Sequence, residues 1–268
     1  MSRVHEVLND TESHLQLVHD FTCDGQHFEH STPFPRYSAL HCFLEYLIRE
    51  LLTDDTLQVD LSQRQAMFES VAESPEDLED LDPRILPIEE ALKHHGFDYQ
   101  PFTDWLKHRE KRFEDADQND IGDYLDNLQL EETFDKLLIQ SVREAFYILF
   151  GNRWLLLHFN DMMAKVLSIH ADEEIPDEYA GNFAKPGVLE RVRLPIWVKR
   201  PVFFRDRGRC VACGVNLSGL QDTWPDEHFD HLVPLAAGGL NDVTNIQLLC
   251  GTCNRKIRTS LHLDVELV

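Results

Sequence analysis

Apolar residues recur every three or four positions through much of the first 170 residues, the spacing of helices with one buried face. The stretch Arg36–Leu52 is the clearest example, and residues 131–150 and 152–169 predict two amphipathic helices joined at Gly151-Asn152. Further helices are predicted from capping and stop signals: one starting at Ser74-Pro75-Glu76-Asp77, one over Ile85–His95 before Gly96, and one capped by Thr103. The pattern predicts an all-helical domain over residues 1–170.

The character of the chain changes after residue 170. Residues 171–195 combine three prolines and two glycines with charged residues, which is typical of a linker. Short apolar runs and glycine-containing turns follow, and they predict a small α+β domain over residues 196–268. The predicted fold class is therefore a helical N-terminal domain joined to a small α+β C-terminal domain.

The two parts differ in charge. The whole chain carries a formal charge of −23, but residues 1–184 contain 14 Lys and Arg against 39 Asp and Glu, whereas residues 185–268 contain 11 against 9. An overall acidic chain is unusual for a nucleic-acid binder, yet the C-terminal part alone is slightly basic. Such asymmetry indicates two domains with different roles.

The chain shows neither a signal-peptide core near its start nor an apolar stretch of membrane-spanning length. We therefore expect a soluble, cytoplasmic protein without a membrane partner. Cysteines stay reduced in that compartment, so clustered cysteines indicate metal binding rather than disulfide bonds.

Four of the six cysteines form two Cys-x-x-Cys pairs, Cys210/Cys213 and Cys250/Cys253. Four thiolates can complete a closed tetrahedral site for a structural Zn²⁺ ion. The 36 residues between the pairs exceed the usual gap of a zinc ribbon, so the ion is expected to clamp the base of a larger module. The alternative is four buried cysteines without a ligand.

A second pattern lies between and beside these pairs. Residues 228–239 read His-Phe-Asp-His-Leu-Val-Pro-Leu-Ala-Ala-Gly-Gly, followed by Asn245 and then by Cys253-Asn254-Arg255-Lys256. In this order, and with both cysteine pairs, these motifs resemble the HNH endonuclease family, whose members share a ββα-metal core. The resemblance covers residues 196–262, about a quarter of the chain.

The resemblance implies a nuclease that hydrolyses phosphodiester bonds, with DNA as the expected partner, and leaves 5′-phosphate ends. It implies His231 as the general base, Asp230 and Asn254 as ligands of a catalytic Mg²⁺ or Mn²⁺, and Asn245 as the residue that orients the base. The third signature position is a histidine in the family's name but is Asn254 here, which leaves the metal preference open.

The residue types agree with this chemistry. Asp230 and His231 are neighbours in a predicted strand, so their side chains point to different sides. Carboxylate and amide oxygens are hard ligands suited to Mg²⁺ or Mn²⁺, and a neutral histidine can accept a proton from water near pH 7. His228 shares a face with Asp230, where it either contacts the phosphate or has no catalytic role.

Basic residues around this constellation are candidates for contacts with nucleic-acid phosphates, the alternative being a solvated charged surface. They are Arg200, Arg205, Arg207, Arg209, Arg255, Lys256 and Arg258.

The favoured interpretation is a metal-dependent HNH endonuclease whose acidic helical domain regulates the nuclease, recruits a protein partner or forms a homodimer. One such site cuts one strand, so double-strand cleavage requires a dimer or two events. Antiviral defence and mobile elements are both compatible settings. The alternatives are a non-catalytic, zinc-containing adaptor that binds DNA or protein, and a ribonuclease centred on Arg153 and His158.

Overall fold

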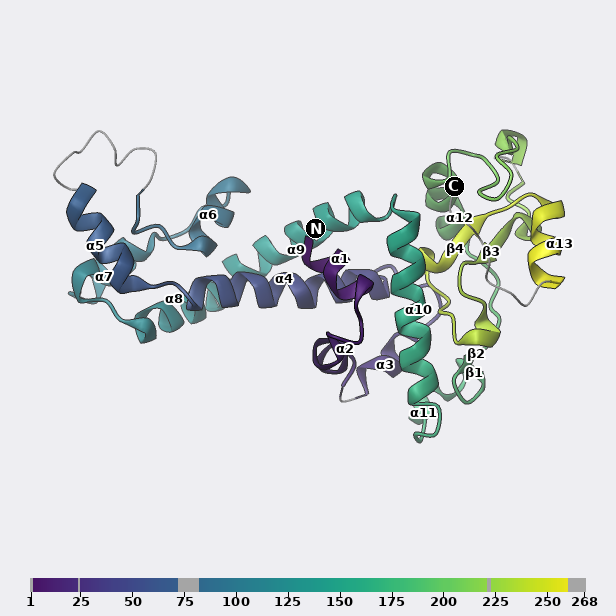
Figure 1. The fold of residues 1–268 in the computed structure, drawn as a ribbon, viewed down its shortest axis with the longest axis horizontal. Helices are drawn as coiled ribbons and strands as arrows, with labels where there is room; N and C mark the ends of the chain where they lie inside the picture. The colour runs from purple at the N-terminus through teal and green to yellow at the C-terminus, as the bar shows by residue number, and fades with distance from the viewer. Residues whose placement is uncertain (1, 24, 72–81, 221–222, 260–268) are drawn as a thin grey trace. The chain divides into compact units, whose positions relative to one another are not determined.

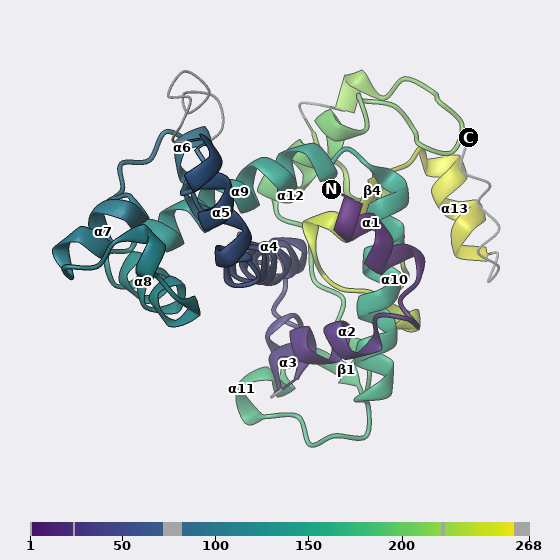
Figure 2. The same cartoon turned by 60° about the vertical axis from the view of Figure 1, so that its left-hand side comes forward.

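The computed structural model describes residues 2–23, 25–71, 82–220 and 223–259. This part of the chain is mostly helical, with helices α1 to α13 and two small antiparallel sheets (Figures 1 and 2). No helix within it is both long enough and apolar enough to cross a membrane. The helices of the first part and the small α+β module near the C-terminus confirm the predicted fold class.

The chain divides into two compact units. Unit 1 comprises residues 1–44 and 145–268, and unit 2 comprises residues 45–144. The division falls within α4 (Ala39–Leu57) and within α9 (Thr133–Leu149). The first helices and the helix after Asn152 therefore belong to the same unit as the C-terminal module, a division that differs from the boundaries expected at residues 170 and 196.

Unit 2 is a helical body whose other elements are α5 (Leu61–Val71), α6 (Pro87–His94), α7 (Phe102–His108) and α8 (Gln118–Leu130). Leu92, Phe102 and Tyr124 are fully buried in its core. The unit contains 27 Asp and Glu against 10 Lys and Arg, a formal charge of −17. Most of the negative charge of the chain therefore lies in unit 2.

Some of the capping and stop signals predicted from the sequence coincide with observed helix ends, and others do not. The side chain of Asn152 accepts a hydrogen bond from the Leu155 amide at 3.1 Å and so caps α10 (Arg153–Ile169). Gly96 follows α6 in the left-handed conformation, with φ +71°. Thr103 lies inside α7, which Pro101 precedes, so it does not cap the helix. The predicted helix start at residues 74–77 lies outside the described residues.

In unit 1, α10 stands beside short N-terminal helices and the C-terminal module (Figure 1). The N-terminal helices are α1 (Ser2–Asn9), α2 (Leu15–Thr22) and α3 (Gln26–Glu29). Residues 171–195, expected as a linker, contain α11 (Asp177–Ala180) and a two-stranded sheet of β1 (Phe183–Lys185) and β2 (Val188–Leu189).

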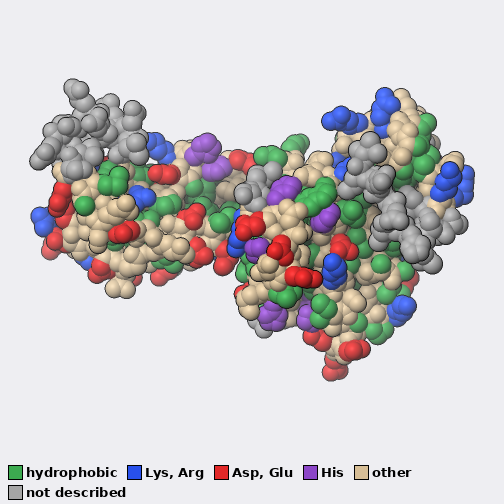
Figure 3. Space-filling view, viewed as in Figure 1, with side chains coloured by type: hydrophobic (Ala, Val, Ile, Leu, Met, Phe, Trp, Pro, Cys, Tyr) green, Lys and Arg blue, Asp and Glu red, His purple; other side chains and the backbone are tan. Residues whose placement is uncertain are grey.

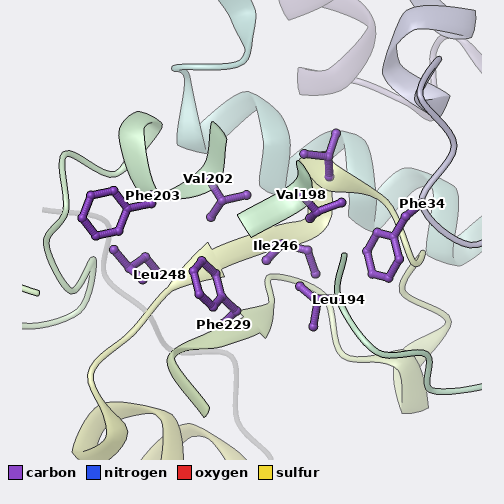
Figure 4. Close-up of a cluster of buried hydrophobic side chains, with 9 residues drawn as sticks. Phe34, Leu194, Val198, Val202, Phe203, Phe229, Ile246 and Leu248 are labelled. Atoms are coloured by element: carbon purple, nitrogen blue, oxygen red, sulfur yellow. The ribbon is translucent and has the colours of Figure 1, made fainter. Parts of the chain in front are cut away.

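The C-terminal module consists of α12 (Ile196–Arg205), the antiparallel strands β3 (Phe229–His231) and β4 (Ile246–Leu248), and α13 (Gly251–Thr259). Apolar side chains of α12 and of both strands meet in one buried cluster (Figure 4). Phe34 joins this cluster from the N-terminal segment, and its backbone amide donates to the Asn241 carbonyl at 2.7 Å. The core of the module is therefore completed by residues far away in sequence.

Candidate functional site

The four paired cysteines form a zinc-binding cluster at one end of the module. Their sulfur atoms all lie within 4.8 Å of one another. Cys210 and Cys213 sit in a tight turn, where the Gly214 amide donates to the Cys210 carbonyl, and Cys250 and Cys253 flank the first turn of α13. Four sulfur ligands at this spacing suit a tetrahedral Zn²⁺ ion.

The electrostatics of the cluster favour a bound cation. The Cys253 amide donates to Cys250 Sγ at 3.4 Å and helps to lower the pKa of the Cys250 thiol to about 7. Burial and the neighbouring sulfur atoms raise the pKa of Cys253 to about 12. Four thiolates cannot accumulate here without a positive charge between them, which a structural zinc ion supplies.

The two strands present the central motif of the candidate nuclease site. Asp230 pairs with Gln247 and His231 with Ile246 across the β3–β4 ladder, and both Asp230 and His231 are buried. Because side chains alternate along a strand, these neighbours project from different faces of the small sheet. Helix α13 then carries Asn254, whose Nδ2 donates to the Glu227 carbonyl at 2.7 Å, just before β3 begins.

Asn254 keeps one polar atom without a partner. The residue is 3% exposed, and its Oδ1 atom is buried and makes no hydrogen bond with any described residue. Because Nδ2 already donates to Glu227, Oδ1 is held as a free acceptor. A buried acceptor in this state costs free energy unless a donor or a cation approaches it, so the donor set of Asp230 and Asn254 fits a hard divalent ion.

Asn245 fixes the loop between the strands. It is fully buried; its Oδ1 accepts from the Val233 amide at 2.9 Å, and its Nδ2 donates to the Val233 and Leu240 carbonyls at 3.0 and 2.9 Å. The loop is so close-packed that a Cβ atom on Gly239 would lie 1.9 Å from the Val233 oxygen. Asn245 thus holds the backbone that follows His231, which is an indirect way of orienting that histidine.

A residue that the sequence analysis did not single out, Asn241, contacts His231 directly. Its Oδ1 atom lies 3.3 Å from His231 Nε2, and its Nδ2 donates to the Glu190 carbonyl at 2.8 Å. The second bond identifies Oδ1 as an acceptor, so His231 donates from Nε2 and Nδ1 is its basic nitrogen. Only the folded chain shows this, because one more asparagine in a polar turn carries no distinctive signal.

The ring of His228 is held in the same way. Its Nδ1 atom donates to the Leu249 carbonyl at 2.9 Å, which makes Nε2 its basic nitrogen. The contact ties His228 to the residue that precedes Cys250.

Charged residues behind the strands form a buried network. Asp206 accepts from Arg205 Nε at 2.8 Å and from the Leu248 amide at 2.9 Å, and Arg153 lies within 3.4 Å of the same carboxylate. Arg153 also donates to Gln247 at 3.1 Å. The guanidinium of Arg153 is therefore used to join α10 to β4, which accounts for it without the ribonuclease alternative.

The basic residues predicted to contact phosphates differ in their exposure. The Arg205 side chain is 2% exposed and bound to Asp206, so it cannot reach a phosphate without breaking the network, contrary to expectation. The other candidates with described side chains are exposed, and basic side chains gather over the C-terminal module (Figure 3). They are Arg200, Arg207, Arg209, Arg255 and Lys256. The side chain of Arg258 lies outside the described residues.

Comparison with known proteins agrees with the resemblance seen in the sequence. Residues 210–260 match the family model of the HNH endonucleases. The matched segment begins at the first zinc-cluster cysteine and includes β3, β4 and α13. Comparison with curated proteins and with solved structures found no significant match.

Proposed function

Since residues 210–260 carry an HNH endonuclease domain, we propose that the protein is a metal-dependent endonuclease that hydrolyses phosphodiester bonds in DNA. The observation that carries the proposal is the buried, unpartnered Asn254 oxygen, held beside the strand that bears Asp230 and His231. A zinc-stabilised adaptor has no need for a buried acceptor without a donor. A metal-binding active site does.

His231 is the general base in this proposal. Its Nε2 atom is directed to Asn241, so Nδ1 takes the proton of the attacking water. Asn241 is a positioning residue, because it selects the tautomer and restrains the ring. Asn245 positions the same histidine through the loop backbone.

Asp230 and Asn254 would hold the catalytic Mg²⁺ or Mn²⁺ through oxygen atoms. When bound, such an ion neutralises charge that develops on the phosphate and the departing oxygen. The exposed basic residues around the module would bind flanking phosphates, with Arg205 excluded because of its burial.

The zinc ion has a structural role in the proposal. The Val211 amide, between the first two cysteines, donates to the Leu248 carbonyl at the end of β4. The cluster therefore fastens the first cysteine turn, β4 and α13 together, and holds Asn254 beside β3.

We propose that unit 2 regulates the nuclease, recruits a protein partner or forms a homodimer. Its charge of −17 disfavours binding to DNA and favours binding to a basic protein surface. Nicking of one strand is the expected activity of one chain, and double-strand cleavage is expected of a dimer. A cytoplasmic role in defence against foreign DNA fits this activity.

The test is cleavage of supercoiled plasmid by the full-length protein with Mg²⁺ or Mn²⁺, with an RNA substrate in parallel. We expect metal-dependent nicking of DNA by the wild type and none by Asp230→Ala. Asp161→Asn, which changes a half-exposed acid of α10, serves as the control and should nick normally. Zinc-loaded wild-type protein that binds DNA but never cuts it would favour the adaptor instead.

A further inference from the structure

A second group of metal-ligating side chains lies in unit 1, outside the nuclease motifs. His27 belongs to α3, His170 directly follows α10, and Glu173 comes three residues later. One ligand atom from each side chain lies within 4.8 Å of the others. Among the described residues, only this group and the cysteine cluster bring metal-binding side chains together in this way.

The hydrogen bonding of His27 leaves its lone pair pointed at a carboxylate. The residue is 2% exposed, and its Nδ1 atom lies 3.3 Å from the Thr22 carbonyl, which can only accept a hydrogen bond. A neutral ring that donates from Nδ1 to this carbonyl carries its lone pair on Nε2. Nε2 lies 3.3 Å from Glu173 Oε2, yet it is buried and forms no hydrogen bond with any described residue.

A lone pair on Nε2 that faces a carboxylate oxygen at this distance is unfavourable, and a cation bound between the two atoms would relieve it. The other oxygen of Glu173, Oε1, is hydrogen-bonded to the second imidazole at 2.6 Å from His170 Nδ1. The two rings stack with their centroids 4.3 Å apart.

The spacing between His27 and Glu173 agrees with a metal ion bound by both. Nitrogen and oxygen ligands about 2.1 Å from a tetrahedral ion lie about 3.4 Å from each other, close to the distance between His27 Nε2 and Glu173 Oε2. We propose that His27, His170 and Glu173 bind a divalent transition-metal ion of the zinc type, at a site separate from the cysteine cluster. Two imidazoles and one carboxylate suit Zn²⁺, and the partly exposed His170 and Glu173 leave room for a water ligand.

The site would join the N-terminal helices to α10. His27 comes from α3, and the other two ligands come from the segment directly after α10, the helix whose Asn160 donates to Thr244 in the nuclease module. A metal ion here therefore stabilises the N-terminal part of unit 1 without contacting the residues proposed for catalysis.

The test compares the metal content of full-length wild type, Glu173→Gln and His170→Asn after equilibration with Zn²⁺ and removal of free metal. His19→Asn, at an exposed histidine of α2, is the matched control. We expect both ligand variants to contain one zinc equivalent less than the wild type, and the control to contain the same amount. Both variants alter partly exposed side chains, so folding should be preserved.

Substitution with Co²⁺ separates the two sites. The cysteine cluster gives a thiolate-to-cobalt charge-transfer band, whereas a site of nitrogen and oxygen ligands gives only weaker ligand-field bands. We expect Glu173→Gln and His170→Asn to lose ligand-field intensity and to keep the thiolate band. Equal metal contents in all four proteins, or loss of the thiolate band together with the other bands in both ligand variants, would overturn the proposal.

Discussion

Substitution of Asp206 by asparagine should destabilise the nuclease module strongly. The Asp206 side chain is 1% exposed and holds two guanidinium groups, those of Arg205 and Arg153, and it also accepts from the Leu248 amide. Asparagine has the same shape but no charge, and its NH₂ group faces donors. The variant would therefore leave two arginines without a counter-ion, one of them almost completely buried.

The magnitude follows from the burial. Removing the charge of one partner of a buried ion pair costs about 3–5 kcal/mol of unfolding free energy, whereas exposed ion pairs contribute about 0–1 kcal/mol. The matched control is Asp115→Asn, since Asp115 pairs with Arg112 at 2.9 Å and both side chains are more than half exposed. We expect Asp206→Asn to lose at least about 3 kcal/mol of unfolding free energy, and Asp115→Asn to leave the unfolding free energy close to that of the wild type.

The assay is denaturant unfolding of the full-length, zinc-loaded protein. Release of zinc to a chromogenic chelator reports on the module, and circular dichroism reports on the helices of both units. If Asp206→Asn released its zinc at the same denaturant concentration as Asp115→Asn and the wild type, the buried network would not hold the module together.

Three more substitutions test other parts of the structure. Gly239→Ala should abolish nicking and lower the unfolding free energy by on the order of 3 kcal/mol, because its Cβ would overlap the Val233 oxygen. The control is Gly219→Ala, which has no atom within 4 Å of the new Cβ and should change neither nicking nor unfolding free energy. Glu89 is buried, which raises its pKa to about 7, so the folded protein keeps a proton that the unfolded chain loses between pH 4.5 and 7. The unfolding free energy of the wild type should therefore fall as pH rises through that window, and that of Glu89→Gln should fall less. The same pH dependence of unfolding free energy in both proteins would contradict the raised pKa of Glu89. Cys253→Ser should lose zinc and destabilise the module in metal analysis and thermal unfolding. A variant with full zinc content and normal stability would contradict a structural zinc site at the cysteine cluster.

Local signals in the sequence predicted much of the helical structure. Asn152 was recognised as the start of a helix and Gly96 as the end of one, because capping depends on neighbouring backbone groups. Not every cap is evident from the sequence. Asp117 lies in an acidic run, and the structure shows that it accepts from the amides of Asn119 and Asp120 and caps α8.

Contacts between distant segments could not be predicted. Phe34 completes the core of the module, and the Ala39 amide donates to Asp242, 203 positions later. The apparent linker supplies the Glu190 carbonyl that fixes the orientation of Asn241. None of these partners has a fixed sequence spacing, so only the folded chain shows that the first 44 residues belong with the nuclease module.

The candidate site shows the same difference between local motifs, which the sequence reveals, and contacts that form only on folding. The cysteine cluster and the position of Asp230 and His231 on one strand were predictable, because both depend on short, ordered motifs. The burial of Arg205 and the contact of Asn241 with His231 were not. Both depend on which side chains face each other after folding.

The nuclease centre is tested most directly by the rate of plasmid nicking by His231→Ala in the presence of Mg²⁺ or Mn²⁺. Loss of a general base typically costs about 10²–10⁴ in rate, so nicking should fall by this factor while zinc content, unfolding free energy and DNA affinity stay close to those of the wild type. A His231→Ala protein that nicks DNA at the wild-type rate would contradict the assignment of this site as the nuclease centre.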